Sequence, residues 1–351
     1  MKVAFLGGGT GGHLAAGVAV AEELRRRGHD ALFLIAGRQV EHAMLGPRGL
    51  QHKELFGDRS RPGPLALPSW WSATSRWRRA VHDYDPDAIV VLGGWVALPA
   101  VFTGFFGRPS VLIEQNARPG KVQRLLGQRV EWACLTVEGQ GMPRGKRGTS
   151  VTGNPSPELE SCDRGAAAAA LGLDPSRRTL LLMGGSGGAA DLNALLPSLT
   201  AVLAARSEPW QVLNLTGGRA APGLEEPPVP VVRQAFLDGM SAAYSVADVA
   251  VCRAGGCTVS ELALTGTPSV LVPYPHHADH HQEANAQRLL AAGGACLVAR
   301  DDPTGRDTAH ELLAGCLDRL DEMAAAARTV AQPGAAAAVA DVVLAAMEET
   351  R

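Results

Sequence analysis

The sequence KVAFLGGGTGGHLAAGVAVAEELRRR, residues 2–27, decides the fold. Its apolar run from Lys2 to Leu6 is typical of a buried strand, and five of the next six residues are glycine. From Leu14 to Arg27 the apolar residues recur at helical spacing, and Gly28 is a natural end for that helix. A strand, a glycine loop and a helix in this order predict the opening of a parallel α/β domain.

The same order of elements returns in the middle of the chain. An apolar strand at 179–183 leads into the glycine-rich run at 184–188, and a helix follows from Asp191. Further apolar strands, which alternate with helices, are expected at 88–92, 110–113, 211–215, 249–252 and 269–272. We therefore predict two Rossmann-like, doubly wound α/β domains facing across a cleft, with a linker near the proline-rich stretch 153–157.

Composition excludes several classes of protein. The hydrophobic fraction of 46% and the charged fraction of 19% indicate a folded protein, and the net charge of −2 gives no field that would attract nucleic acid. The six cysteines form no C-x-x-C pair, which favours free thiols in a reducing compartment. Residues 89–107 carry no charge, but their glycines and proline favour buried core over a membrane span. We expect a soluble or peripheral protein without a signal peptide.

The first glycine loop allows several interpretations. Gly7-x-Gly9-x-x-Gly12 matches the dinucleotide fingerprint, which also needs an acid at the end of the second strand. That strand ends at Ile35 and is followed by Arg38, which leaves binding of NADP by an oxidoreductase as one alternative. A glycine turn without a ligand is another. The glycine content, with His13 directly after it, favours a site that approaches phosphate.

His13 is the first candidate for proton transfer. It falls at the start of the predicted helix, where the helix dipole would lower the pKa of its imidazole and keep it neutral. A neutral imidazole at the mouth of the cleft could accept a proton from a substrate. A histidine that only caps the helix is the alternative.

The run from Val251 to Glu261 is the second candidate site. A strand is followed there by small residues and by a helix start that carries Thr258 and Ser260. Backbone N–H groups and hydroxyls at a helix start suit a diphosphate, and Glu261 could accept both ribose hydroxyls. A capping-box glutamate is the alternative role for Glu261.

Two clusters resemble metal sites but have simpler explanations. The cluster of histidines with Asp279 after the strand at 269–272 fits solvent-facing imidazoles better than a zinc site, and the acids at 83–87 precede a strand, at the wrong end of a sheet for ligands. We predict no metal and no cofactor, so that negative charge on a bound substrate would fall on helix dipoles and hydroxyls. The histidines concerned are His276, His277, His280 and His281.

Tryptophans and arginines alternate in one stretch. Tryptophan favours the membrane interface and arginine favours anionic headgroups, so this stretch predicts contact with an anionic membrane surface. Core tryptophans with a solvated arginine face are the alternative. The residues are Trp70, Trp71, Trp77, Arg76, Arg78 and Arg79.

A set of motifs along nearly the whole chain resembles the MurG family of cell-wall glycosyltransferases. The motifs are Gly8-Gly-Thr-Gly-Gly-His13, Gly93-Gly94-Trp95, Glu114-Gln115-Asn116, Gly153-Asn154-Pro155, Gly184-Gly-Ser186, Phe236-Leu237-Asp238-x-Met240, Cys252 to Glu261 and Asp279-x-x-Gln282-x-x-Asn285. The resemblance implies the two-domain GT-B fold and transfer of N-acetylglucosamine from UDP-GlcNAc to lipid I, which gives lipid II. It also implies that the last helix returns to the first domain, so the domains would be residues 1–153 plus 335–351 and residues 154–334.

The resemblance also implies roles for individual residues. Leu237 would read uracil through its backbone, Glu261 would bind ribose, and Gln282 would contact the sugar hydroxyls. Ser186, Cys257 and Thr258 would hold the UDP phosphates. Cys257 and Thr258 belong to a helix start at which Gly256, Val259 and Ser260 would also bind the donor. Thr10, Gly11, Gly12, His13 and Asn116 would line the acceptor side and approach the donor phosphates.

Several positions depart from the family pattern and bear on donor affinity and specificity. The family has Arg at Pro157, Gln at Gly187 and at His281, Pro at Ala16 and Tyr at Trp95. Loss of the arginine removes a charge-assisted contact to phosphate, which would weaken donor binding.

These observations lead to one mechanistic hypothesis. An acceptor hydroxyl that His13 deprotonates attacks the anomeric carbon in a single inverting displacement, with Glu114 as the reserve candidate for the base. We expect an enzyme at the cytoplasmic face of the plasma membrane. The alternatives are a related transferase for another UDP-sugar or acceptor, the NADP oxidoreductase, and a non-catalytic nucleotide-binding relative.

Overall fold

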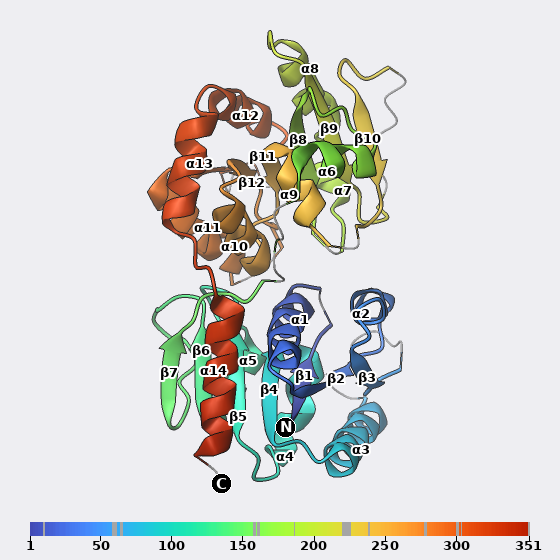
Figure 1. The fold of residues 1–351 in the computed structure, drawn as a ribbon, viewed down its shortest axis with the longest axis vertical. Coiled ribbons are helices and arrows are strands. Elements are labelled where there is room, and N and C mark those ends of the chain that lie inside the picture. The colour runs from blue at the N-terminus through green and yellow to red at the C-terminus, as the bar shows by residue number, and fades with distance from the viewer. Residues whose placement is uncertain are drawn as a thin grey trace. The chain divides into compact units, whose positions relative to one another are not determined.

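The chain folds into two compact α/β units, shown in a computed structural model (Figure 1). The first unit comprises Met1–Pro157 and Pro333–Arg351, and the second comprises Glu158–Gln332. The structure describes residues 1–9, 11–57, 62–63, 66–156, 159, 162–185, 187–219, 226–237, 239–276, 279–299, 302 and 304–349.

The first unit is built on a seven-stranded sheet of order β3-β2-β1-β4-β5-β6-β7, and all its described strand pairings are parallel. The chain runs outward from β1 to β3 and then crosses to β4, so the strand order reverses between β1 and β4. Ligands bind at such a switch point, outside the carboxyl ends of the strands. The strands are β1 (Lys2–Gly7), β2 (Asp30–Ile35), β3 (Gln51–Glu54), β4 (Ala88–Gly93), β5 (Ser110–Glu114), β6 (Trp132–Leu135) and β7 (Gly148–Val151).

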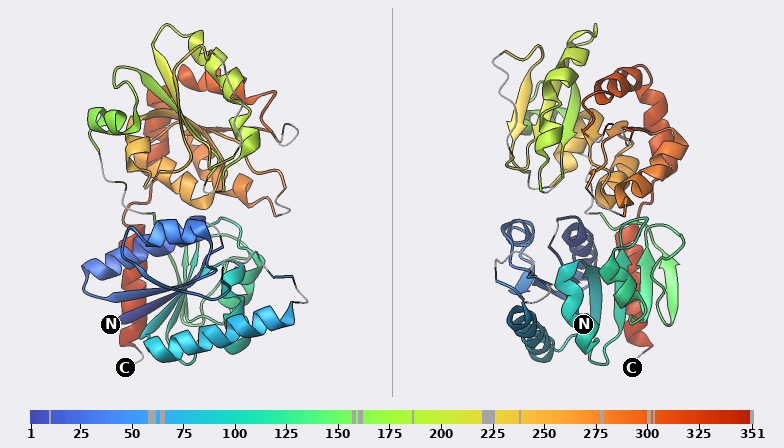
Figure 2. Two further views of the ribbon diagram at one scale, coloured as in Figure 1. Left: turned by 90° about the vertical axis from the view of Figure 1, so that its right-hand side faces the viewer. Right: turned by 180° about the vertical axis from the view of Figure 1, so that it is seen from behind.

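Helices cover both faces of this sheet because successive strand residues point to opposite sides. Val3 and Phe5 face a core formed with α1 and α14, whereas Ala4 and Leu6 face a core formed with α3, η1, α4 and α5. Figure 2 shows α14, in red, beside the sheet of the first unit, although this helix comes from the end of the chain. The helices are α1 (Gly11–Arg26), α2 (Gln39–Leu45), α3 (Leu67–Tyr84), the 3-10 helix η1 (Trp95–Ala97), α4 (Leu98–Thr103), α5 (Lys121–Gly127) and α14 (Ala335–Glu348).

The second unit repeats this plan with a six-stranded parallel sheet of order β10-β9-β8-β11-β12-β13. Its switch point lies between β8 and β11. The strands are β8 (Arg178–Met183), β9 (Trp210–Leu215), β10 (Val231–Gln234), β11 (Ala247–Cys252), β12 (Ser269–Leu271) and β13 (Ala295–Leu297).

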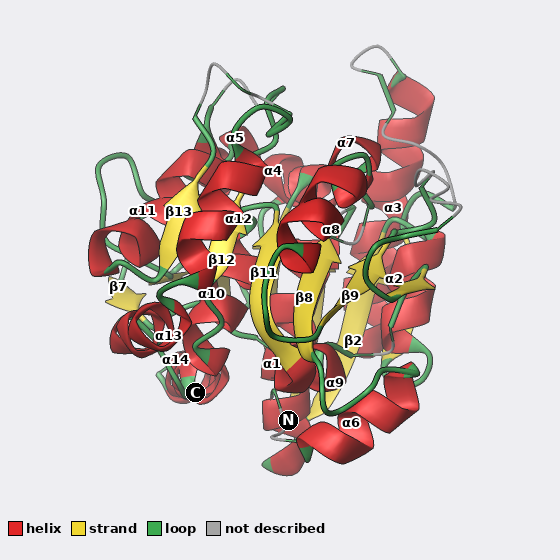
Figure 3. Cartoon of the chain, turned by 90° about the horizontal axis from the view of Figure 1, so that it is seen from above, coloured by secondary structure: helices red, strands yellow, loops and turns green. Residues whose placement is uncertain are grey.

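Two groups of helices cover the second sheet, one on each face. One core includes α7, α8 and α12, the other includes α6, α9, α10 and α11, and α13 contributes a residue to each. Figure 3 shows the strands of the second unit between these helices. The helices are α6 (Arg164–Leu171), α7 (Ala190–Asn193), α8 (Leu196–Ala204), α9 (Ser241–Val246), α10 (Gly256–Thr265), α11 (His281–Ala292), α12 (Ala309–Leu317) and α13 (Leu320–Thr329).

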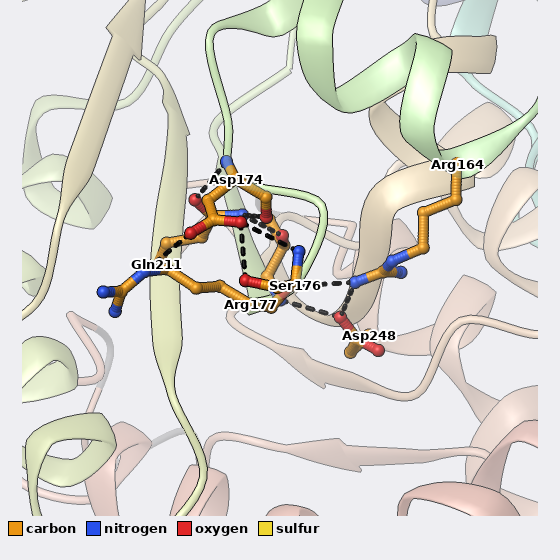
Figure 4. Close-up of polar contacts among 7 residues, drawn as sticks. Arg164, Asp174, Ser176, Arg177, Gln211 and Asp248 are labelled. Carbon is orange, nitrogen blue, oxygen red and sulfur yellow. Dashed lines mark hydrogen bonds and ion pairs between the residues drawn. The ribbon is translucent and has the colours of Figure 1, made fainter.

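A polar network closes the amino ends of β8, β9 and β11 (Figure 4). Asp248 accepts hydrogen bonds from Arg164 Nη2 and from the backbone N–H of Thr179, both at 2.7 Å. Gln211 exchanges two hydrogen bonds with the backbone of Asp174, at 2.8 and 3.0 Å. These groups satisfy each other at the edge opposite the carboxyl ends, so we assign them a structural role.

The fold class predicted from the sequence is confirmed as two Rossmann-like parallel α/β units. The apolar strands and the first helix were predicted within a few residues. The predictions missed the short strands β3, β6, β7, β10 and β13. No helix among the described residues is both long and apolar enough to cross a membrane.

Candidate active site

The first glycine loop crosses the switch point of the first unit, and at Gly7 and Gly9 neighbouring atoms leave no room for a side chain. A Cβ atom at Gly7 would lie 2.7 Å from Leu92 Cβ, and one at Gly9 would lie 2.6 Å from Trp95 Nε1. The φ angle of Gly9 is +84°, a conformation that L side chains rarely adopt. Close packing over β4 and η1 therefore accounts for these glycines without a ligand.

A buried carboxylate holds this loop in place. Glu41, in α2, is 0% exposed, and its Oε1 accepts a hydrogen bond from the Gly9 N–H at 2.8 Å. Arg38 donates from Nη1 to the Gly9 carbonyl. The Gly9 N–H is thus already bonded to a carboxylate and does not face a ligand in this structure. The result also argues against dinucleotide binding, in which such N–H groups meet a pyrophosphate.

His13 and the segment after β5 lie together at the carboxyl edge of the first sheet. His13 falls in the first turn of α1, as predicted, and its carbonyl accepts a hydrogen bond from Gln115 Nε2 at 3.2 Å. The neighbouring residue Glu114 is 0% exposed, and its Oε1 accepts a hydrogen bond from Asn116 N–H at 2.9 Å. Gly11 and Gly12 begin α1, whereas Thr10 lies outside the described residues.

Glu114 is a second group there that could exchange protons. Burial raises the pKa of its carboxyl to about 7. Its Oε2 has no hydrogen-bond partner among the described residues. A buried, half-bonded carboxyl with a pKa near neutrality can bind or release a proton at working pH. The geometry thus brings both predicted base candidates to one edge of the sheet.

The second unit places Glu261 in a comparable position at its own switch point. α10 begins at Gly256, just after β11, so Glu261 is its sixth residue rather than the third that a capping box requires. The alternative role as a capping-box glutamate is therefore wrong. Tyr244, from α9, donates its hydroxyl to Glu261 Oε2 at 2.9 Å, and burial raises the pKa of this carboxyl to about 7.

Other predicted donor-side residues surround the start of α10. Cys257 and Thr258 lie in its first turn, followed by Val259 and Ser260. Leu237 packs against the same core as α10, next to Phe236, whose side chain is 59% exposed. Ser186 lies outside the described residues.

Side chains of α11 tie together the loops after β11 and β12. Gln282 Oε1 accepts a hydrogen bond from Tyr274 N–H at 2.8 Å, and Asn285 Nδ2 donates to the Ala254 carbonyl at 3.1 Å. The neighbouring imidazoles contact acids that are two or three residues away in sequence: His280 contacts Glu283, and His281 contacts Asp279. In the part of the chain that is described, which omits His277, no three His, Cys, Asp or Glu side chains could hold a metal ion together.

Comparison with known proteins identifies the family. Residues 3–134 match the glycosyltransferase family 28 N-terminal domain, and residues 179–342 match the family 28 C-terminal domain. The UDP-N-acetylglucosamine--N-acetylmuramyl-(pentapeptide) pyrophosphoryl-undecaprenol N-acetylglucosamine transferase of Pseudomonas entomophila is 36% identical over 357 residues, 98% of this chain and 97% of the relative. The transferase of the same name from Alkalilimnicola ehrlichii is 36% identical over 372 residues, 100% and 99% of the two chains. The crystal structure of Acinetobacter baumannii MurG aligns with a TM-score of 0.69 at 25% identity, over 98% of this chain and 99% of that one. The chain belongs to the MurG family.

As in the family pattern quoted above, both glycine loops, His13 and Glu261 are present in this MurG-family chain. One departure, Trp95, packs beside the first loop, and another, Gly187, accepts a hydrogen bond from Arg219 Nε at 3.0 Å through its carbonyl. Pro157 lies outside the described residues.

The predicted membrane stretch lies on α3, and its residues divide between two faces of this helix. Trp71 is 80% exposed, and Arg76, Arg78 and Arg79 are also exposed. Trp77 is 0% exposed and donates from Nε1 to Thr103 Oγ1 at 3.0 Å, so its assignment to a membrane surface is wrong. Trp70 is partly buried against Phe56 and Trp95. Leu67 and Phe102, which the predictions did not include, are 69% and 77% exposed.

Sequence reasoning missed three residues that shape these sites. Glu41 holds the first glycine loop, Tyr244 holds Glu261, and Arg219 contacts the second glycine loop. For Glu41 one signal was available: a glutamate three residues after a helix boundary often bonds backward to backbone N–H groups. Nothing in the local sequence marks Tyr244 or Arg219.

Proposed function

We propose that this chain transfers N-acetylglucosamine from UDP-GlcNAc to lipid I, the undecaprenyl-pyrophosphoryl-MurNAc-pentapeptide, and so makes lipid II in peptidoglycan synthesis. The observation that carries the proposal is the full-length relationship, at 36% identity, to transferases named for this donor and acceptor. Each α/β unit of this chain also has candidate site residues at its switch point.

The second unit binds the donor in this proposal. The Glu261 carboxylate accepts hydrogen bonds from the ribose hydroxyls, and the backbone of Leu237 reads uracil. Cys257 and Thr258, in the first turn of α10, offer N–H groups and a hydroxyl to the diphosphate together with Ser186, and the positive end of the helix dipole favours its charge. Gln282 contacts the sugar hydroxyls.

The first unit binds the acceptor and carries the base. His13 takes the proton from the acceptor hydroxyl, whose oxygen attacks the anomeric carbon of GlcNAc. The new C–O bond forms as the bond to the UDP phosphate breaks, and UDP leaves with the electron pair, so the configuration inverts in one step. Gly11, Gly12 and Asn116 line the acceptor side, and Glu114 is the reserve base.

The test of this function is a transfer assay with radiolabelled UDP-GlcNAc and a lipid I analogue. We expect label in the lipid product, and among UDP-sugars the highest kcat/KM with UDP-GlcNAc. Stronger turnover with another UDP-sugar would favour a related transferase. No transfer despite UDP binding would favour the non-catalytic relative.

We propose that the protein acts at the cytoplasmic face of the plasma membrane, where it binds an anionic membrane surface. Leu67 and Trp71 on α3 and Phe102 on α4 present exposed apolar side chains, and these two helices pack against each other. Exposed Arg76, Arg78 and Arg79 lie on the same α3. Apolar and basic side chains together favour an interface with anionic lipids.

Trp71→Glu is expected to reduce binding to vesicles that contain anionic lipid by about tenfold. The substitution removes the contact of the indole with the lipid and places a negative charge beside the anionic headgroups. Sedimentation of the protein with vesicles measures this. Phe236→Glu, at an exposed aromatic of the second unit, is the matched control and should leave binding unchanged. Equal loss in both variants would contradict a membrane surface on α3.

A further inference from the structure

The two oxygens of Glu41 bond to different parts of the first unit. Oε2 accepts hydrogen bonds from the N–H groups of Gly37 and Arg38, both at 2.8 Å, which caps the start of α2. Oε1 accepts from Gly9 N–H at 2.8 Å, 32 residues away in sequence, and from Ala36 N–H at 3.4 Å. The cap of α2 needs only Oε2. Oε1 is therefore left to hold the glycine loop.

Arg38 completes the hold on Gly9 from the other side. Its guanidinium donates to the Gly9 carbonyl, so the N–H and the carbonyl of one residue are both bonded to side chains from the start of α2. Gly9 comes two residues before α1 and four before His13. Without these bonds a residue at φ +84° in a glycine-rich loop would have several conformations of similar energy.

We propose that Glu41 and Arg38 are positioning residues, which fix the loop before α1 and thereby the place of His13 relative to the acceptor. The inference rests on the proposed function, because it assigns the pair a part in that reaction. Neither side chain touches a reacting atom in this view. Their effect is on the geometry of proton transfer, where displacement of a group by about 1 Å can cost roughly 100-fold in rate.

Glu41→Gln tests the loop contact with little change in shape. A glutamine has one acceptor oxygen, and the two short bonds at the cap favour its placement there, so its NH2 group would face the Gly9 N–H. Two donors would then oppose each other and release the loop. We expect kcat to fall about 10- to 100-fold. The KM for UDP-GlcNAc and the affinity for UDP should stay within about twofold, since the donor residues are on the second unit.

Ala43→Gly is the matched control for damage to α2. Ala43 is an exposed interior residue of this helix, and glycine there weakens the helix without touching the loop. If Glu41 only stabilised α2, the two variants would lose activity to the same extent at equal loss of Tm. A kcat of Glu41→Gln no lower than that of Ala43→Gly, or a parallel loss of UDP affinity, would overturn the proposal.

Arg38→Met gives an independent measurement if Glu41→Gln does not fold. Arg38 is exposed, and methionine keeps the apolar part of its side chain but cannot bond to the Gly9 carbonyl. We expect a several-fold lower kcat with an unchanged KM for UDP-GlcNAc. A wild-type kcat in this variant would count against Arg38 as a positioning residue. Absence of transfer by the wild-type protein would instead refute the proposed function, so the two failures are distinguishable.

Discussion

His13→Ala is expected to reduce kcat for transfer to a lipid I analogue by about 100- to 10,000-fold, the usual contribution of a positioned general base. The affinity for UDP should remain within about twofold, because the residues proposed to hold UDP belong to the second unit. Steady-state assays and calorimetry with UDP measure the two quantities. Added imidazole should restore part of the activity, since it supplies the missing base to the space left by the side chain.

Glu114→Gln is the control that separates the two base candidates. Burial raises the pKa of Glu114 to about 7, so this carboxyl could itself produce a rate that rises with pH through neutrality. Glutamine keeps the oxygen that accepts from Asn116 N–H but cannot take a proton. If His13→Ala kept kcat within a few-fold of wild type while Glu114→Gln lost it, the base would be Glu114.

The fold was largely predictable because its central strands are long apolar runs that end in glycine loops. β1, β4 and β8 are buried along most of their length, so their sequences contain almost no polar residue. The missed strands are short and at or near sheet edges. β3 has the sequence QHKE and β7 has GTSV, and both are partly exposed. β3 and β7 form the two edges of their sheet, where their side chains are only partly covered, so these two strands carry almost no hydrophobic signal.

The candidate site was predictable where one motif contains the whole feature and was missed where the partners are distant in sequence. His13 and Glu261 fall at or near helix starts, and the glycine-rich loops directly before them predict where these helices begin. The bond of Glu41 to Gly9 depends on the packing of α2 against α1, which no local pattern records. The tryptophans of α3 show an intermediate case: Trp70 and Trp77 are seven residues apart and share the inner face, whereas Trp71 is turned outward.

Glu261→Ala is expected to weaken UDP-GlcNAc binding by roughly 100-fold, because two ribose hydroxyls would lose a charged acceptor. The variant also leaves the Tyr244 hydroxyl without its partner, so part of the loss would come from disorder of that side chain. Glu261→Gln keeps an oxygen for Tyr244 and removes only the charge. It should weaken donor binding less than alanine does, and kcat at saturating donor should stay near that of the wild type.

The pH dependence of donor binding tests the same carboxylate. Burial raises the pKa of Glu261 to about 7 in the free protein, and only its ionised form can accept from both hydroxyls. At pH 6 about one-tenth of the carboxyl would be ionised, so the Kd for UDP-GlcNAc should be close to tenfold higher at pH 6 than at pH 8. Calorimetry with UDP-GlcNAc, whose diphosphate diester does not titrate near neutrality, should show this dependence in the wild type and not in Glu261→Gln. Tighter binding at pH 6, or the same dependence in both proteins, would mean that the ribose is held elsewhere.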